Sequence, residues 1–111
     1  MRAHGDAHTP IWITELGWGS DGPDRFEINA GIDGQRRLLG RTFARLVEHR
    51  RRWRLKHVMW FSWRDPPGNV SNCGFCESAG LFWNDQRPKP AWRVFRRLIQ
   101  SRPDADHRVG V

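Results

Sequence analysis

The chain has 111 residues and a formal net charge of +7, which arises from 19 basic and 12 acidic residues. Its length allows one domain with a small core, although only 38% of its residues are apolar. No apolar run approaches the ~20 residues of a membrane-spanning helix, and the opening residues, MRAHGDAHTP, lack the pattern of a signal or transit peptide. Composition therefore indicates a globular domain with no membrane partner, and it assigns no cellular location.

Two pairs of a strand and a helix are predicted in chain order. Residues 11 to 15, IWITE, are β-branched and aromatic and predict a short strand, which a connection rich in glycine and aspartate follows. A helix is predicted from about Gln35 to Arg52, because apolar residues recur there with helical spacing. Its apolar stripe comprises Leu39, Phe43, Leu46 and Val47.

A second strand is predicted over residues 57 to 63, HVMWFSW, whose apolar character is typical of a strand buried on both faces. Two prolines end it, and a loop over residues 66 to 80 leads to the short segment GLFW. The last helix begins near Pro90, which suits a first helical position. Its predicted inner face comprises Ala91, Trp92, Phe95, Leu98 and Ile99.

This order predicts the α/β class, as a β-α-β-α unit with two parallel strands. Two parallel strands leave faces and edges that need cover, so the unit is expected to be part of a larger fold. In such sheets the reactive groups lie at the carboxyl ends of the strands. Glu15 ends the first strand, and Asp65 follows the second. We expect Asp65 to fix the turn there, by pairing with Arg64 or by accepting nearby amides.

Three segments together resemble a known family of enzymes. IWITELGW, then VMWFSWRD, then SAGLFWNDQRPKPAW occur in this order over roughly residues 9 to 100. They resemble the seventh and eighth strand-helix units of retaining glycoside hydrolases with (β/α)8 barrels, near the cellulase-like family five and the xylosidase-like family thirty-nine. The resemblance implies a partial barrel, cleavage of O-glycosidic bonds of a carbohydrate, and no metal or organic cofactor. KPAW opens the last helix, and we interpret it as structural.

The resemblance implies a role for one carboxylate and for several tryptophans. Glu15 is expected to be the catalytic nucleophile, and the alternative for it is a structural ion pair with an arginine. Trp63 is expected to be the platform for the sugar ring, with Trp60 as the alternate because strand parity is not fixed by the sequence. Trp18 is expected to line the same cleft. The alternative for all three tryptophans is packing in the core.

One element of the family pattern is missing. Retaining hydrolysis needs a second carboxyl group about 5 Å from the nucleophile, and in the resembled clan this is a glutamate preceded by asparagine. The sequence contains no Asn-Glu pair. We therefore expect residues 1–102 to be an incomplete barrel domain that is poorly folded and inactive alone, with residues 103–111 as a polar tail. It is interpreted as a gene fragment, a decayed remnant or one half of a split enzyme, and the first two interpretations are preferred.

The cysteines and histidines provide no metal site. Cys73 and Cys76 form a single CxxC motif in a loop, without the second pair that a zinc site needs. We expect them to pin this loop over the barrel mouth, as a disulfide if the parent protein is exported. The five histidines form no ligand pattern and are interpreted as surface or satisfied residues.

A different class of function stays open alongside the hydrolase. Arginine is abundant, since only two of the basic residues are lysines, and there are seven tryptophans. A small basic module for nucleic acid or an anionic polymer would gather arginines and aromatic residues on one face. The predicted elements instead place tryptophans on strands and arginines on helix exteriors, which favours the hydrolase and no nucleic-acid partner. A remnant with no activity is the third interpretation. The sugar, the linkage and exo or endo action are not specified.

Overall fold

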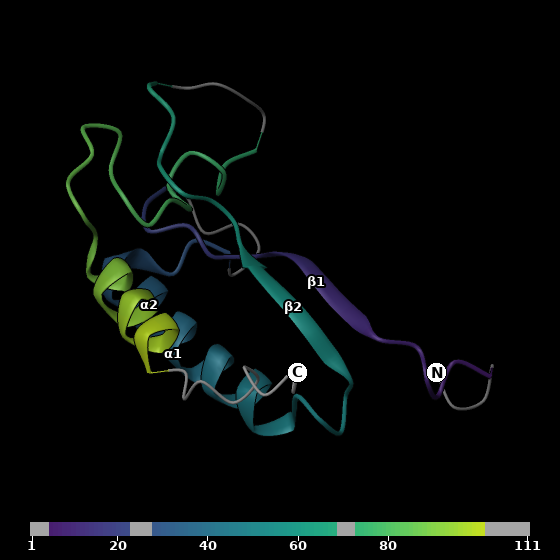
Figure 1. Cartoon of the computed structure of the whole chain (residues 1–111). Helices are drawn as coiled ribbons and strands as arrows, with labels where there is room; N and C mark the ends of the chain where they lie inside the picture. Colours follow the sequence, from purple (N-terminus) through teal and green to yellow (C-terminus); the bar gives the residue numbers. More distant parts are fainter. Residues whose placement is uncertain (1–4, 23–27, 69–72, 102–111) are drawn as a thin grey trace, which may run out of the picture.

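The computed structural model describes residues 5–22, 28–68 and 73–101 of the chain. Its elements are β1 (Ile11–Leu16), α1 (Gly31–His49), β2 (Leu55–Trp60) and α2 (Pro90–Gln100), and β1 pairs with β2 in parallel. The predicted β-α-β-α order and the α/β class are therefore confirmed (Figure 1). The predicted polar tail, residues 103–111, lies outside the described residues.

Helix α1 begins and ends earlier than the sequence predicted. Asp33 in its first turn accepts two hydrogen bonds from the Arg36 guanidinium, at 2.7 Å and 2.9 Å. Hydrogen bonding to Arg36 is the main reason why the pKa of Asp33 lies below its usual range. The arginines after His49 lie in a turn, because the amide of Leu55 returns to the carbonyl of Arg50 at 2.8 Å. Arg54 has a left-handed φ of 55°, which lets the chain reverse into β2.

Strand β2 also differs from its predicted range, since it covers Leu55–Trp60 and not residues 57–63. From Ser62 onward the backbone bonds to the later segment Ala79–Phe82 and not to β1. The amide of Ser62 donates to Ala79 O at 3.3 Å, and the amide of Leu81 donates to Trp63 O at 3.0 Å. A tertiary partner 17 or more residues away therefore ends the strand, which an apolar run cannot reveal.

The core lies between the two helices and the loop before α2, and the sheet contributes Trp60 to it. Leu39 of α1, Leu81 of the loop and Ala91 of α2 are buried together. Partly buried apolar residues pack against this cluster: Phe43, Trp60, Phe82, Trp92, Val94, Phe95 and Leu98. Val47 and Ile99 were predicted to share the inner helix faces, but both are about half exposed, at 50% and 49%. The helices contact each other over a narrower stripe than their sequences predict.

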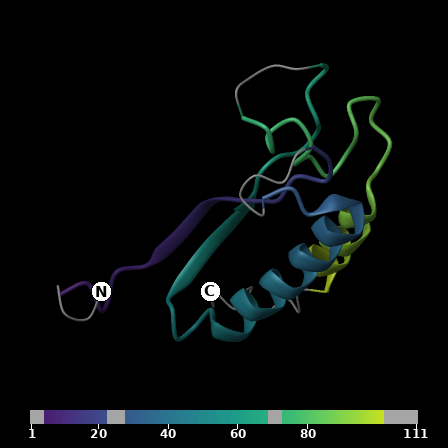
Figure 2. The same cartoon turned by 180° about the vertical axis from the view of Figure 1, so that it is seen from behind.

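No described residue covers the other face of the sheet, so the burial of β2 on both faces, which was expected for a larger fold, is not met within this chain. Both helices lie on one side of the two strands, as the two opposite views show (Figures 1 and 2). On the uncovered face Trp12 is 55% exposed and Met59 is 46% exposed. The ring of Trp12 lies against the ring of its register partner His57, at 4.0 Å between centroids. An apolar face of this kind marks a contact surface.

Within the three described ranges no helix combines the length and the apolar character that a bilayer crossing requires.

We expect the 111-residue chain to associate with itself through the bare sheet face when it is alone in solution. Replacing both Trp12 and Met59 by Ser should lower its sedimentation coefficient and its binding of an apolar dye, because the exposed apolar area falls. Ile99→Ser, at an exposed position on α2, is the matched control and should change neither quantity much. Equal effects of the double variant and of the control would contradict this assignment.

Candidate active site at the strand ends

Glu15 lies at the carboxyl end of β1, on the bare face of the sheet. Ile13 pairs with Val58 and Leu16 pairs with Trp60, so Thr14 and Glu15 together stand opposite the single residue Met59. This is a β-bulge, a device that re-aims a side chain next to functional sites. The bulge leaves Glu15 exposed.

The carboxylate of Glu15 has no partner among the described residues. No hydrogen bond or ion pair joins it to any side chain in residues 5–22, 28–68 and 73–101, whereas the other carboxylate near the strand ends, Asp65, is buried and paired. The structural ion pair with an arginine, which was the alternative for Glu15, is thus absent from these ranges. A solvated carboxylate at a strand end is free to react.

The two strand ends are held against each other directly after Glu15. The amide of Phe61 donates to the carbonyl of Leu16 at 2.9 Å. At Gly17 a Cβ would collide with the backbone carbonyl of Phe61, so only glycine allows the two backbones to approach this closely. Gly17, two residues after the predicted nucleophile, is therefore required for the close approach of the two backbones.

A buried lysine joins the segments that follow the two strands. Lys89 is fully buried at the residue before α2. Its ammonium donates to Ser20 Oγ at 2.8 Å, to the carbonyl of Ser78 at 2.8 Å, and to Asp65, the nearest oxygen of which lies at 2.7 Å. Burial lowers the pKa of Lys89, and the hydrogen bond and the charge of Asp65 act in the opposite direction. All three N–H donors are therefore satisfied, each by a different segment of the chain.

The prediction for Asp65 is half confirmed. Its Oδ1 accepts the amide of Gly80 at 2.8 Å, as the expected turn-fixing role requires. Its cation is Lys89, and the expected pairing with Arg64 is wrong, because Asp65 is buried and Arg64 is exposed. KPAW was interpreted only as helix-start chemistry, and Lys89 was missed. The signal available in the sequence was the rarity of lysine, since the chain has only two lysines and uses arginine for its other basic residues.

Gln35 of α1 supports the same region from the opposite side. Its side-chain amide nitrogen donates to the carbonyl of Trp18 at 2.9 Å and lies 3.3 Å from the carbonyls of Ser78 and Gly80. Gln35 is fully buried, and its Oε1 has no partner within the described part of the chain. A polar residue in the inner row of α1 thus holds the turn after β1.

The three predicted sugar-binding tryptophans lie in different environments. Trp60 packs against the core, and its indole nitrogen donates to Ala79 O at 3.1 Å. Trp18 lies beside it, with ring centroids 6.0 Å apart. Trp63 is 61% exposed and packs on the helix side, against Phe82 at 4.9 Å and Trp92 at 5.4 Å. The structure therefore brings Trp18 and Trp60 together and separates Trp63 from them.

Trp63 also borders an open pocket of about 250 Å³. The other residues that line this pocket are Arg64, Phe82 and Gln86. An exposed indole with a guanidinium and an amide beside it has the chemistry of a sugar contact, because flat apolar rings stack on sugars and polar groups bind hydroxyls.

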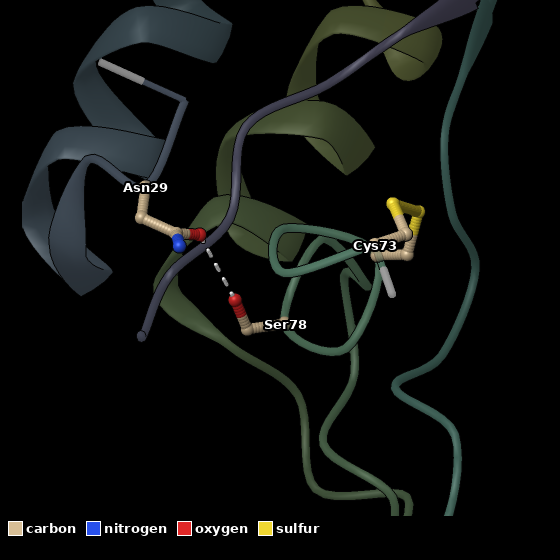
Figure 3. The surroundings of a disulfide bond; sticks show 4 residues. Asn29, Cys73 and Ser78 are labelled. Atoms are coloured by element: carbon tan, nitrogen blue, oxygen red, sulfur yellow. Dashed lines mark hydrogen bonds between the residues drawn. A yellow bond between two sulfur atoms is a disulfide. The ribbon is translucent and has the colours of Figure 1, made fainter. Parts of the chain in front are cut away.

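The loop that carries the cysteines folds back onto the strand ends. Cys73 and Cys76 are joined by a disulfide (Figure 3). Between them Phe75 packs on Phe61, with 5.9 Å between the ring centroids. Ser78 follows the disulfide in this loop. Its hydroxyl lies 2.7 Å from Asp21 O and 3.5 Å from Asn29 Oδ1, the second of which is drawn in Figure 3. The loop therefore contacts the segments that leave both strands.

The described ranges hold no group of three or more His, Cys, Asp or Glu residues that could bind a metal ion. Among the described residues, Trp12 lies on the bare sheet face, whereas Arg87 lies over the ring of Trp83 at 5.0 Å in the loop before α2.

Comparisons with known proteins give matches among solved structures. No protein-family model matches the sequence, and no curated protein does. A GH5_18 enzyme of Bifidobacterium longum subsp. longum ATCC 55813, in complex with Manβ1-4GlcNAc, is similar with a TM-score of 0.65 and 25% identity, over 86% of this chain and 21% of that chain.

Two further structures share the fold at lower identity. A GH5_18 enzyme of Streptomyces cattleya has a TM-score of 0.63 and 21% identity, over 85% of this chain and 22% of that chain. An active-site mutant of the Rhizomucor miehei β-1,3-glucanosyltransferase, in complex with laminaritriose, has a TM-score of 0.59 and 22% identity, over 80% of this chain and 30% of that chain. The chain thus spans about a fifth of the length of the GH5_18 enzymes.

Gly17→Ala should destabilise the strand ends, because its Cβ collides with a backbone carbonyl that cannot move aside. We expect the free energy of unfolding to fall by about 1–3 kcal/mol, the usual range for overpacking. Urea titration of the polypeptide as its gene encodes it measures this change. Gly74→Ala is the matched control, since a Cβ there meets nothing within 4 Å. A Gly17→Ala variant as stable as the control would refute the close approach.

Proposed function

We propose, from the premise that the chain has the fold of part of a GH5-like (β/α)8 glycoside hydrolase barrel, that it carries the nucleophile of a retaining β-glycosidase. The observation that carries the proposal is Glu15, a carboxylate without a partner among the described residues, at the carboxyl end of a parallel strand. Active sites of such barrels lie at this end of the strands.

The proposed reaction proceeds in two displacements. The carboxylate of Glu15 attacks the anomeric carbon, and the bond to the leaving oxygen breaks as a second carboxyl group gives that oxygen a proton. Water, which loses its proton to the same second group, then displaces Glu15 from the glycosyl-enzyme. Both steps invert the anomeric carbon, so the product keeps the configuration of the substrate.

We assign the second carboxyl group to a different part of the barrel. The two carboxyl groups of a retaining enzyme lie about 5 Å apart, and no Asn-Glu pair of the kind that the resemblance implies is present in the 111 residues. The chain alone is therefore proposed to be inactive. The proposed partner of the chain is the remainder of the barrel, which would cover the sheet face on which Trp12 and Met59 are exposed.

The proposed substrate is a β-linked carbohydrate. The similar B. longum enzyme binds Manβ1-4GlcNAc, so an aryl β-mannoside is the first probe. Trp18 and Trp60 lie close to each other at the strand ends, and Trp63 presents an exposed ring. We assign the sugar platform to Trp60, with Trp18 beside it, because Trp63, the first candidate from the sequence, packs on the helix side against Phe82 and Trp92.

Replacing Glu15 by Gln should abolish turnover of 2,4-dinitrophenyl β-mannoside by the complete polypeptide that the locus encodes. We expect kcat to fall by at least ~10³-fold, as for the loss of other catalytic nucleophiles. Glu48→Gln is the matched control, since Glu48 is an exposed carboxylate on α1 that pairs with Arg45. Equal kcat values in the wild type and in Glu15→Gln would overturn the assignment.

Glu15→Gly with added azide identifies the role of the carboxylate. Azide fits the space of a missing nucleophile and attacks the anomeric carbon from the same side, so the expected product is the α-mannosyl azide. A β-mannosyl azide would instead make Glu15 the proton donor. The configuration is read directly by NMR of the product.

Translation of the DNA upstream of the Met1 codon in all frames tests the partner. We expect some 150 or more residues of strand-helix repeats with an Asn-Glu at a strand end, given the ~250 residues of a complete barrel. An intergenic region with no such repeats would contradict a gene fragment. Turnover of the aryl glycoside by the isolated 111-residue chain would contradict the assignment of the second carboxyl group to another part of the barrel.

A further inference from the structure

We propose that Lys89 is a positioning residue, which fixes the ends of both strands and thereby holds Glu15 against the sugar. The inference rests on the proposed function and deepens it. It starts from a buried charged group that the two displacement steps do not use: the Lys89 ammonium is fully buried and touches neither Glu15 nor any other proposed reacting group.

Stability alone does not explain a lysine at this position. A buried ion pair is often no more stabilising than an apolar pair of the same size, because both charges lose their water. Lys89 also lies at the N-terminal end of α2, where the helix dipole disfavours a cation. An apolar residue would avoid both costs. What the ammonium provides instead is three donors that point to three separate segments.

These three segments are the ones that form the mouth of the site. Ser20 lies five residues after Glu15, Asp65 lies five residues after the end of β2, and Ser78 lies in the loop with the disulfide. The Lys89 contacts to them are 2.7–2.9 Å long. If one contact moves, the ammonium leaves another acceptor unsatisfied, so the three segments have to move together.

Two fixed points of this arrangement, Leu16 and Ser20, follow Glu15 closely in the chain. Ser20 is held by Lys89 and by Ser78, the carbonyl of which accepts both the amide and the hydroxyl of Ser20 at 3.0 Å. Across the sheet the amide of Phe61 holds Leu16. The carboxylate of the bulged residue Glu15 has no hydrogen bond in the described ranges, so these neighbours help to set the place of the residue.

The test measures rates per active site and not only stability. Wild type, Lys89→Met, Lys89→Arg and the control Lys56→Met are made in the complete encoded polypeptide. Active sites are titrated with a 2-deoxy-2-fluoro β-mannoside that traps the glycosyl-enzyme. Lys56, the other lysine, is exposed on β2 and should be silent.

We expect Lys89→Met to lower kcat per titrated site by 10- to 100-fold, since a displacement of about 1 Å near the reacting atoms costs up to ~10²-fold. Hydrogen exchange should rise in residues 17–22 and 61–65 while the centres of β1 and β2 stay protected. Lys89→Arg should be defective too, because a planar guanidinium cannot replace three converging N–H donors. If Lys89→Met does not fold, Ser20→Ala removes one of the three acceptors, and a 3- to 10-fold loss is expected.

The outcomes separate the two proposals. A purely structural lysine would reduce the number of titratable sites and the melting temperature but leave kcat per site unchanged, and this result overturns the inference. Full activity of Lys89→Arg would overturn the requirement for three contacts. A wild-type polypeptide that neither turns over the glycoside nor is labelled at Glu15 overturns the proposed function and, with it, the catalytic role of Lys89. Unchanged hydrogen exchange in Lys89→Met overturns the positioning itself, whatever the activity.

Discussion

The ion pair of Lys89 and Asp65 is the interaction on which the arrangement of the strand ends depends. Removing an ammonium and a carboxylate from water costs several kcal/mol per ion, and this cost is offset only when the geometry is good and every donor is used. Here the ammonium reaches Asp65, Ser20 and Ser78, and the carboxylate also accepts the amide of Gly80. Because these groups come from four places in the sequence, the pair can be buried only if those places meet. The segments that carry Ser20, Asp65 and Ser78 therefore have to meet at the buried ammonium of Lys89, because its charge cannot be buried without them.

The described residues cover only one face of the sheet. The helices and the loop residues Ala79 and Leu81 bury the face that carries Trp60, and the core ends there. On the other face the bulge opposite Met59 turns Thr14 and Glu15 outward, into space that no described element covers. A carboxylate in water is a weak nucleophile by comparison with one enclosed in a dry site, where nearby dipoles replace the solvent. Completing the proposed site therefore means covering this face, which links the bare apolar residues to the chemistry.

The sequence predicts the kind of each element well and the limits of each element less well. Helical spacing locates both helices, and the apolar run locates β2, because these patterns are local. The predicted end of β2 fails at Trp60, where the backbone changes partner from β1 to Ala79 and Leu81. Lys89 was missed for a related reason. Lys-Pro before an apolar stripe is sufficient to explain a helix start, so nothing local shows that the lysine also binds Asp65, 24 residues earlier. The place of Glu15 at a strand end could be predicted because its signal is local: a charged residue ends a strand, and glycines follow it. Its role as nucleophile comes from the resemblance and stays a prediction.

The proposed chemistry makes the accuracy of this arrangement matter. In both glycosidase mechanisms one carboxyl group protonates the leaving oxygen, and the separation of the two groups decides what the other one does: at about 5 Å it attacks the anomeric carbon, whereas a larger separation leaves room for a water that it activates for inversion. If the second group belongs to another part of the barrel, that separation is set by how rigidly each part holds its own strand ends. In this chain the carboxylate of Glu15 has no hydrogen bond among the described residues, and the backbone that follows Glu15 is held by Gly17 against Phe61, by Gln35 at Trp18 and by Lys89 at Ser20. Rigidity at the neighbours leaves the carboxylate oxygens unoccupied and still fixes the carbon that carries them.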